Sequence, residues 1–412
     1  PRVAVIGGGA AGFFAALAAA GAFPHADVTI YEKSRSVLGK VRVSGGGRCN
    51  VTNSAPTLAH LMKGYPRGEK FLRPLFQQFD NHATVRWFEQ RGVPLKTEPD
   101  GRIFPVSDQS SDVIACLERE ARRLGVAVRT SAGVSKISGQ LGVGSWQLVL
   151  QNGEIVEADR VIVTTGGNPN LAGYDWLAAL GHGIAPPVPS LFTFNVPDSP
   201  LLSLAGIAVP GASVRLAGTK QSQTGPALLT HWGFSGPAVL RLSAWAAREL
   251  AERGYQFEAA FNWVFPKKSD EVLAVLAGTR TLHARKQIAS QPLFGLPQRF
   301  WRALVDEAGL SESTRWAEAP AKAVNRLAEL LVNGMFSVRG KTTFKEEFVT
   351  CGGIALGEVN PHTLESRRAP GLFFAGEVLD VDGITGGYNF QAAWTTGYVA
   401  GRACLEDYCG AG

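Results

Sequence analysis

The sequence predicts an α/β protein organised around a βαβ unit at its N-terminus. Residues 3–6 (VAVI) are typical of a buried strand, and they run directly into a G-x-G-x-x-G turn at residues 7–12. A helical stretch and a second apolar strand at 28–31 follow. The apolar run at 161–163 predicts a further strand of the same sheet.

Each glycine of the turn has its own task. Gly7 lets the chain turn tightly, Gly9 leaves room for a pyrophosphate against bare backbone, and Gly12 lets the helix pack close to the strand. The helix N-terminus offers N–H groups and a positive dipole end to the phosphates. Glu32, at the end of the second strand, is placed to accept both ribose hydroxyls. The unit therefore predicts a bound dinucleotide.

The same stretch has an alternative interpretation as a membrane span or signal segment. Residues 3–23 carry no charge and are long enough for either role. A spanning helix gains nothing from the grouped glycines, however, and the lone Arg2 is a poor positively charged flank. We therefore expect no membrane span and a cytoplasmic protein.

The composition is that of an ordinary globular protein with two or three domains, because 45% of its 412 residues are hydrophobic and 18% are charged. The net charge of +6 permits an anionic partner without requiring one. The five cysteines form no C-x-x-C pair and no cluster with metal-ligand spacing, so we expect a reducing compartment and no metal. They are Cys49, Cys116, Cys351, Cys404 and Cys409.

A second glycine cluster, residues 45–47, follows the βαβ unit and cannot continue a helix or strand. Arg48, Asn50, Thr52 and Asn53 bring donors to a place where backbone can approach a ligand closely. A flexible loop is the alternative. We favour ligand contact because the cluster directly follows the ribose-binding strand.

The rest of the first domain alternates helices and strands. We expect helix over 70–92 and from about Ser110 to Leu124, and a hairpin turn at 152–153. Near Pro186 the chain leaves this domain for a section of different composition.

This middle section starts with short strands, continues with a loop that opens a helix over residues 224–250, and is mainly helical from Lys267 to Met335. Residues 279–302 combine cationic and aromatic side chains without an acidic residue. Such interleaving suits nucleic acid, although solvated cations with buried aromatics are commoner. The residues concerned are Arg280, Arg285, Lys286, Arg299 and Arg302 with Phe294, Phe300 and Trp301.

The tail returns to the first domain. Residues 372–375 predict a buried strand that Gly376 and Glu377 close. A glycine turn at 386–389 then feeds an apolar helix from Gln391, whose dipole would face an electron-rich ring.

The fingerprint with Glu32, the segment VIVTTGG and the segment GLFFAGEVLD resemble the FAD-binding flavoproteins of the glutathione reductase superfamily. That resemblance implies that Glu377 bonds the flavin ribitol. More narrowly, SGGGRCNVTN at 44–53, LTHWGFSGP at 229–237 and AGEVLDVDGITGGYNFQAAWTTG at 375–397 resemble the BaiN and YhiN family of NAD(P)/FAD-dependent oxidoreductases. The resemblance covers the chain from end to end.

This resemblance implies an α/β fold with a Rossmann-type FAD-binding domain built from both chain ends, residues 1–187 plus 340–412. A β-rich domain at 188–265 and a helical region at 266–339 are inserted between them. Arg42 stands where relatives tend to be apolar, which suggests an added phosphate or substrate contact, and Cys351 is expected to be structural.

Family members are described as reductases of a C=C bond in steroid-like acids, as ribosomal RNA dihydrouridine synthases and as aminoacetone oxidases. The resemblance therefore leaves a small molecule and ribosomal RNA open as substrates, and the oligomeric state undecided. An FAD-containing RNA-binding or assembly factor without catalytic activity is a further alternative.

The candidate cofactor-binding residues lie in both glycine turns, at the strand ends and in the tail. They are Gly7, Gly9, Ala10, Ala11, Gly12, Glu32, Lys33, Lys40, Gly46, Gly47, Arg48, Cys49, Asn50, Gly166, Gly376, Glu377, Gly386, Gly387, Tyr388 and Asn389.

Reduction of a C=C bond by hydride transfer also needs a proton donor. The candidates, in order, are Cys49, His231 and Tyr388. In their alternative roles Cys49 fills buried space, His231 anchors a loop through hydrogen bonds, and Tyr388 packs beside the flavin ring. The middle section has no second G-x-G-x-x-G after a strand. We therefore expect NAD(P)H to visit the substrate cavity as a transient reductant, unless another protein supplies the electrons.

Overall fold

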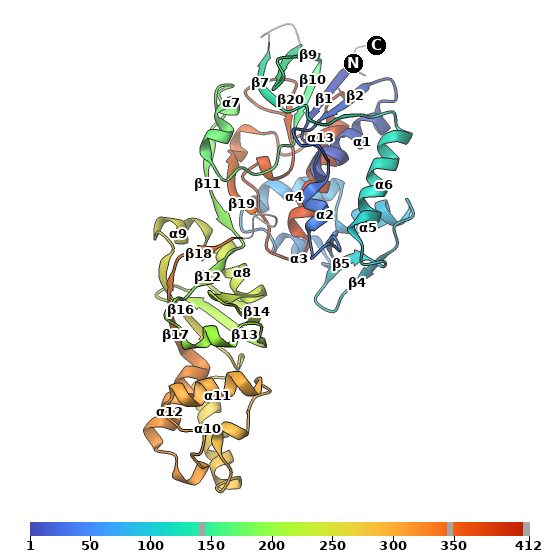
Figure 1. Ribbon diagram of the computed structural model, residues 1–412. Helices are drawn as coiled ribbons and strands as arrows, with labels where there is room; N and C mark the ends of the chain where they lie inside the picture. The colour runs from blue at the N-terminus through green and yellow to red at the C-terminus, as the bar shows by residue number, and fades with distance from the viewer. Residues whose placement is uncertain (140–144, 344–348, 407–412) are drawn as a thin grey trace. The chain divides into compact units, whose positions relative to one another are not determined.

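The computed structural model describes residues 1–139, 145–343 and 349–406. The chain divides into two compact units, of which the first comprises Pro1–Pro189 and Lys345–Gly412 and the second Ser190–Phe344 (Figure 1).

The first unit is built on a five-stranded parallel sheet in the order β20-β10-β1-β2-β6. Val5 pairs with Ile30 on one side and with Ile162 on the other, and Ile162 pairs in turn with Phe373. Because β20 comes from the end of the chain, both chain ends contribute to one sheet. The predicted fold class, α/β with a Rossmann-type domain made from both ends, is confirmed. The strands are β1 (Arg2–Ile6), β2 (Asp27–Tyr31), β6 (Ala127–Arg129), β10 (Arg160–Val163) and β20 (Leu372–Phe374).

Two helices from opposite ends of the chain pack along each other in this unit, α1 (Ala10–Ala22) and α13 (Tyr388–Ala403). A Cβ atom on Gly397 would lie 2.4 Å from the carbonyl oxygen of Ala11, and one on Gly401 would lie 2.1 Å from that of Ala15. The two backbones therefore touch only because both positions of α13 are glycine. The other helices are α2 (Gly39–Val43), α3 (Leu58–Met62), α4 (Glu69–Gln78), α5 (Asn81–Glu89), α6 (Ser110–Arg123) and α7 (Asp175–Ala178).

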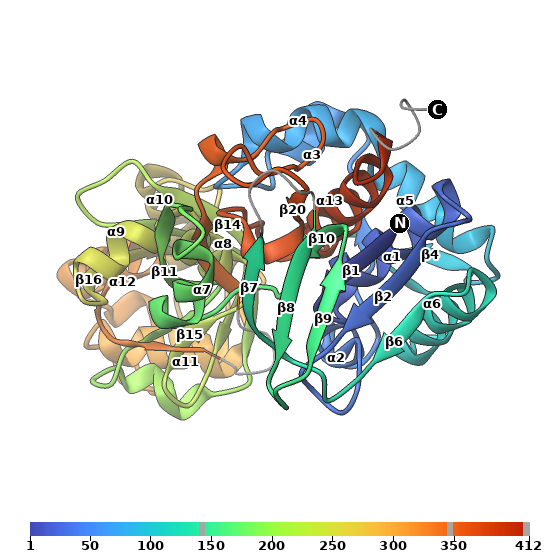
Figure 2. The same ribbon diagram turned by 90° about the horizontal axis from the view of Figure 1, so that it is seen from above.

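Three small sheets complete the first unit. One is the antiparallel meander β7-β8-β9 (Figure 2), in which residues 152–153 form the turn between β8 and β9 as the sequence predicts. Its strands are β7 (Val134–Gly139), β8 (Trp146–Leu150) and β9 (Ile155–Ala158). The second joins β3 (Thr52–Asn53), β5 (Arg102–Pro105) and β4 (Leu95–Thr97), and the third joins β11 (Ile184–Ser190) and β19 (Val349–Ile354).

The second unit holds a seven-stranded sheet in the order β17-β16-β13-β14-β15-β12-β18, whose strands pair antiparallel wherever the register is given. The strands are β12 (Thr193–Asn195), β13 (Ala208–Leu216), β14 (Ser222–Leu229), β15 (Gly233–Ser235), β16 (Gln256–Asn262), β17 (Gly334–Arg339) and β18 (Lys341–Thr342). Its helices are α8 (Pro237–Trp245), α9 (Ala247–Glu252), α10 (Ser269–Leu282), α11 (Gln298–Glu307) and α12 (Ala321–Asn333).

Two expectations for this unit are wrong. Residues 222–229 form strand β14 instead of a loop, because pairing with β13 and β15 overrides the turn signal of Gly225 and Pro226. The end of the segment expected to be helical is strand β17. The β-rich part and the helical part share one hydrophobic core, so their separation into two domains stays a prediction.

Residues 3–23 form a strand, a turn and a 13-residue helix, and not one long helix. Within the described ranges no helix has the length and apolar character needed to cross a bilayer.

Candidate functional site

The three glycines of the first turn differ in the space around them. A Cβ atom on Gly7 would lie 2.5 Å from the carbonyl oxygen of Thr164, and one on Gly12 would lie 1.9 Å from that of Gly7. These two glycines are required by packing. A Cβ atom on Gly9, in contrast, would have no atom within 4 Å, so this position faces open space.

The N-terminus of α1 has the features of an anion-binding site. Its N-cap is Gly9, no side chain caps it, and its first turn, which includes Ala10 and Ala11, contains no acidic residue. The free N–H groups and the positive end of the helix dipole therefore lie beside the open space at Gly9.

The carboxylate of Glu32 is oriented by backbone N–H groups. Its Oε2 accepts a hydrogen bond from the nitrogen of Gly8 at 2.7 Å, and its Oε1 accepts one from Ser34 at 2.8 Å. Each carboxylate oxygen has a second lone pair, so the group can still accept the ribose hydroxyls. Lys33, next in the chain, is exposed.

Residues 50–53, which follow the second glycine cluster, contact the C-terminal glycine turn and the start of α13, although more than 330 residues separate these segments. Asn53 donates to the carbonyl oxygen of Gly386 at 3.0 Å, and Thr52 donates to Gln391 at 2.6 Å. With its amide oriented to satisfy both neighbours, Asn50 accepts from the nitrogen of Gly387 at 2.9 Å. The structure therefore brings together the two turns that the sequence predicts to contact one ligand.

Glu377 lies where the end of β20 approaches the start of α1, since a Cβ atom on Gly376 would come within 2.8 Å of Ala11. Its Oε2 pairs with Lys40 Nζ at 2.8 Å, and its Oε1 accepts from the nitrogen of Thr350 at 2.7 Å. The hydroxyl of Thr350 is buried and has no hydrogen-bond partner in the described chain. Gly166, near the end of β10, has a φ of +74° and open space at its Cβ position.

A loop that the sequence analysis missed, residues 62–68, wraps the C-terminal turn. Tyr65 donates to the carbonyl oxygen of Tyr388 at 2.8 Å, and their rings meet edge to face at 5.7 Å. Arg67 forms a bidentate pair with Asp382, which is completely buried. A Cβ atom on Gly64 would overlap the ring of Tyr388. Residues 63–68 read KGYPRG, and their two glycines are the local sign of a turn.

Cys49, the first candidate proton donor, is wrongly placed for that role. Its side chain has no exposed surface, and burial raises the pKa of its thiol from 9.0 to about 12. The backbone of Cys49 is left-handed, with a φ of +61°, which explains how a residue in a glycine-rich loop can point its side chain into the core. Its alternative role, a buried filler, fits the structure.

Arg48 is also engaged by the protein. Its guanidinium lies 4.0 Å from the ring of Phe104 and pairs with Glu98 at 2.7 Å, and the hydrogen bond with Glu98 raises its pKa. Contact of Arg48 with a cofactor stays a prediction. His231 is exposed and lies in the second unit, whereas Tyr388 is partly exposed at the N-terminus of α13 in the first.

Of the remaining candidates, Gly46 and Gly47 have positive φ and open space at their Cβ positions. Asn389 bonds to both backbone groups of Gly383 and thereby closes the turn. Arg42 is exposed and Cys351 is buried. Within the described chain no group of His, Cys, Asp and Glu could hold a metal ion.

Comparisons with known proteins agree with this geometry. The model of the HI0933-like protein Rossmann domain family matches residues 1–403. The chain belongs to this family. A 3-dehydro-bile acid delta(4,6)-reductase of Clostridium scindens is 31% identical over 98% of this chain and 99% of its own length. A ribosomal RNA dihydrouridine synthase of Haemophilus influenzae is 29% identical over 96% of each chain, and one of Escherichia coli is 28% identical over 98% and 96%.

Solved structures agree on the fold. The 3-ketosteroid-delta4-(5alpha)-dehydrogenase of Rhodococcus jostii matches with a TM-score of 0.50, 18% identity and coverage of 98% of this chain and 96% of that one. The 3-ketosteroid delta1-dehydrogenase of Sterolibacterium denitrificans matches with a TM-score of 0.51, 13% identity and coverage of 98% and 99%. These structures show the fold alone; together with the family match and the curated relative, they identify this chain as an oxidoreductase with a Rossmann-type FAD-binding fold.

The residues present fit FAD. Gly9 leaves space for a pyrophosphate, Glu32 has lone pairs for the ribose, and the unpartnered hydroxyl of Thr350 lies beside Glu377 at the expected ribitol position. The structure thus offers space for the pyrophosphate, acceptors for the ribose and a hydroxyl beside Glu377 for the ribitol.

Proposed function

We propose that this protein is an FAD-dependent reductase that uses NAD(P)H to reduce a C=C bond conjugated to a carbonyl group, with a small enone as its substrate. The observation that carries the proposal is the likeness, over nearly the whole length of both chains, to a relative named for reducing a bile acid at its delta(4,6) positions. The glycine turns, Glu32 and Glu377 supply the matching cofactor site.

FAD bound at this site would supply hydride transfer, and the protein residues must orient the cofactor, exclude water and deliver a proton. Tyr388 is now the first candidate for the proton, because Cys49 is enclosed and Tyr388 is partly exposed on the turn that closes the site. Tyr65 and Gly64 fix the position of the Tyr388 ring. His231 remains the second candidate.

The second unit supports a shared cavity for NAD(P)H and substrate. Its described strands form an antiparallel sheet, and a βαβ dinucleotide site needs parallel strands. NAD(P)H and substrate would therefore bind in turn, in ping-pong kinetics.

Uracil in ribosomal RNA is the second candidate substrate, because two relatives are named as ribosomal RNA dihydrouridine synthases. The five cations between Arg280 and Arg302 are exposed and could contact phosphates. Phe300 and Trp301 are completely buried, however, so they cannot stack on bases. Phe294, the third aromatic residue of this segment, is partly buried. The burial of Phe300 and Trp301 therefore weighs against base stacking by this segment and leaves the small enone as our first candidate.

A substrate panel tests the proposal. Purified FAD-loaded protein with NADPH or NADH should convert a 4-en-3-one steroid acid or 2-cyclohexenone into a product heavier by two hydrogens. Aminoacetone should not be oxidised. Aminoacetone oxidation without enone reduction would favour the amine oxidase alternative, and no turnover with any substrate would favour a structural role for FAD.

The RNA alternative has its own test. If RNA binds through the cationic segment, Arg285→Ala with Arg299→Ala should reduce the dependence of binding on salt, because two phosphate contacts are lost. Arg326→Ala, a change at an exposed arginine of α12, is the matched control. An unchanged salt dependence would exclude this segment.

A further inference from the structure

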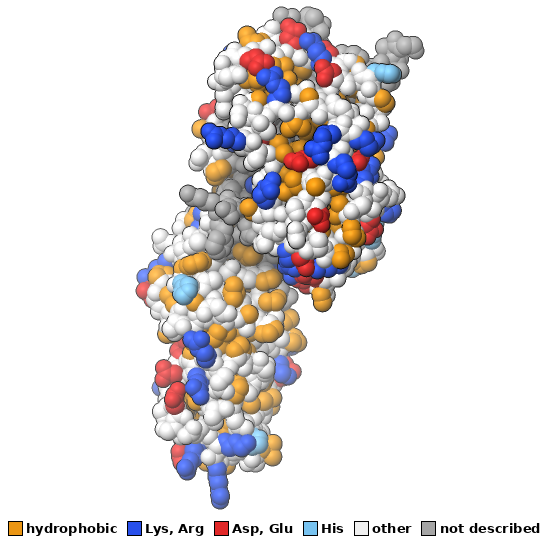
Figure 3. Space-filling view, turned by 45° about the vertical axis from the view of Figure 1, so that its right-hand side comes forward, with side chains coloured by type: hydrophobic (Ala, Val, Ile, Leu, Met, Phe, Trp, Pro, Cys, Tyr) orange, Lys and Arg blue, Asp and Glu red, His pale blue; other side chains and the backbone are white. Residues whose placement is uncertain are grey.

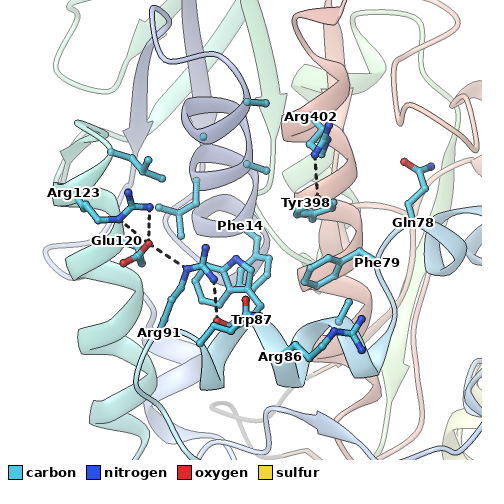
Figure 4. A pocket seen from close by; sticks show the side chains of 17 residues that line it. Phe14, Gln78, Phe79, Arg86, Trp87, Arg91, Glu120, Arg123, Tyr398 and Arg402 are labelled. Carbon is cyan, nitrogen blue, oxygen red and sulfur yellow. Dashed lines mark hydrogen bonds and ion pairs between the residues drawn. The ribbon is translucent and has the colours of Figure 1, made fainter.

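The first unit contains a cavity that runs along α1 from Phe14 to Ala22. Its volume is about 590 Å³, which is within the usual range for small-molecule sites, and its walls come from α1, α4, α5, α6 and α13 (Figure 4). None of the residues that line it is a candidate cofactor-binding residue, so the cavity is distinct from the proposed cofactor site.

Aromatic rings form one wall of the cavity. Phe79 and Tyr398 are stacked, with centroids 4.4 Å apart and an interplanar angle of 26°. The ring centroids of Phe14 and Trp87 are 4.6 Å apart. Trp87 and Tyr398 are partly exposed, and they provide a surface on which a flat apolar body can lie, backed by the buried rings of Phe14 and Phe79.

Four guanidinium groups surround these rings, from Arg86, Arg91, Arg123 and Arg402. Glu120 is the one acidic residue among the described residues that line the cavity, and it accepts from Arg91 at 3.2 Å and from Arg123 at 2.9 Å. Burial would raise the pKa of Glu120, but its bonds to Arg123 and Arg91 outweigh burial and lower the pKa. The cavity therefore keeps a clear excess of positive charge.

Arg86 and Arg402 are the two cations of the cavity without a carboxylate partner in the described part of the chain. Both side chains are exposed; Arg402 donates to the Tyr398 hydroxyl at 3.3 Å, and its guanidinium lies 5.9 Å from the centre of the Tyr398 ring. Each lies in the last turn of a helix, where the dipole favours a cation. In the described residues no carboxylate therefore competes with a ligand for these two arginines.

Another cavity of the same unit, with a volume of about 330 Å³, differs in how its arginines are paired. Its arginines are both paired: Arg2 bonds with Glu157 and Asp159, and Arg129 with Glu154. That cavity offers no spare cation.

We infer that the cavity formed by α1, α4, α5, α6 and α13 binds a small amphipathic anion, with an aromatic or polycyclic body against Trp87 and Tyr398 and a carboxylate or phosphate on Arg86 and Arg402. The planar fork of a guanidinium matches either anion with two hydrogen bonds. Figure 3 shows Lys and Arg side chains beside hydrophobic ones on a face of the first unit.

The test is calorimetric titration of the FAD-saturated protein with 2-naphthoate and, separately, 2-naphthyl phosphate. We expect one molecule per chain. The neutral 2-naphthamide, which has the same shape, should bind at least tenfold more weakly. The double variant Arg86→Gln with Arg402→Gln should weaken binding of both anions at least tenfold, since two charge-assisted contacts are lost.

Two further variants separate the site from general surface charge. Arg122→Gln, a change at an exposed arginine of α6 that does not line the cavity, should bind the anions like the unmodified protein. Ala83→Leu, which adds volume inside the cavity without changing charge, should block binding. Retained FAD would show that each variant is folded. Binding that survives both Arg86→Gln with Arg402→Gln and Ala83→Leu, or no binding of either anion, would overturn the inference.

Discussion

Lys40 Nζ lies 2.8 Å from Oε2 of Glu377, which follows it by 337 positions in the chain. This contact joins the N-terminal and C-terminal parts of the cofactor site. It also places a cation beside the path that we assign to FAD.

Lys40→Met should therefore weaken FAD binding. Because the Lys40 side chain is 53% exposed, solvent screens the pair, and we expect only about a threefold to tenfold rise in the dissociation constant. Fluorescence titration of the apoprotein with FAD measures this dissociation constant. Lys136→Met, at an exposed position of β7, is the matched control, and an equal effect of both changes would contradict a role for this contact.

Gly9 and Gly12 should respond differently to alanine. Gly9→Ala places a methyl group in open space, so the apoprotein should unfold at an unchanged temperature while FAD binds at least tenfold more weakly. Gly12→Ala places it 1.9 Å from the carbonyl oxygen of Gly7, so the apoprotein itself should lose stability, by about 2 kcal/mol or more. Thermal unfolding with and without FAD separates the two effects. The assignment fails if Gly9→Ala binds FAD normally.

Cys49 should be protected from thiol reagents. At pH 8 a thiol with a pKa of about 12 has almost no thiolate, and the side chain is enclosed as well. Alkylation followed by peptide mapping should leave Cys49 unmodified in the native protein and label it after unfolding. Cys404, also buried with a pKa of about 12, is an internal control. Rapid labelling of Cys49 would restore it as a candidate donor.

The same thiol gives a pH dependence of stability. Its folded pKa is raised above 9.0, so the stability it contributes is complete below pH 9 and is lost as the pH rises toward 12. Cys49→Gly removes the thiol and suits the positive φ, so this variant should lose less stability between pH 9 and 11 than the unmodified protein.

Removal of Arg67 should destabilise the first unit. Arg67→Met leaves the completely buried Asp382 without its cation, which costs about 3–5 kcal/mol in comparable buried pairs. Arg73→Met, at an exposed position of α4, should change the free energy of unfolding by less than about 0.5 kcal/mol. Denaturant unfolding measures both. Similar small effects would mean that the Arg67 pair is not a structural clamp on the C-terminal turn.

The parts of the site that the sequence predicts are those in which backbone geometry demands one residue type. The backbone around Gly7, Gly12 and Gly387 leaves no room for a Cβ atom, so each position requires glycine and can be recognised in the sequence. The burial of Cys49 is not visible, because it depends on a single φ in an irregular loop. The clamp by Tyr65 and Arg67 depends on contacts more than 300 residues away, which no local pattern encodes.

In the second unit, the sequence predicts alternating short strands but not the strand over 222–229. Glycine and proline at 225 and 226 are typical of a turn, and only the neighbouring strands β13 and β15 hold these residues extended. The burial of Phe300 and Trp301 likewise depends on a core assembled from distant segments.

We propose that the FAD-loaded protein accepts electrons from NAD(P)H and passes them to a conjugated C=C bond. Anaerobic mixing followed by absorbance at about 450 nm tests both electron transfers. We expect NADPH or NADH to bleach the flavin, and a 4-en-3-one steroid acid then to restore its colour with formation of the saturated ketone. Bleaching without reoxidation by any conjugated enone, or no bleaching by either nucleotide, would contradict it.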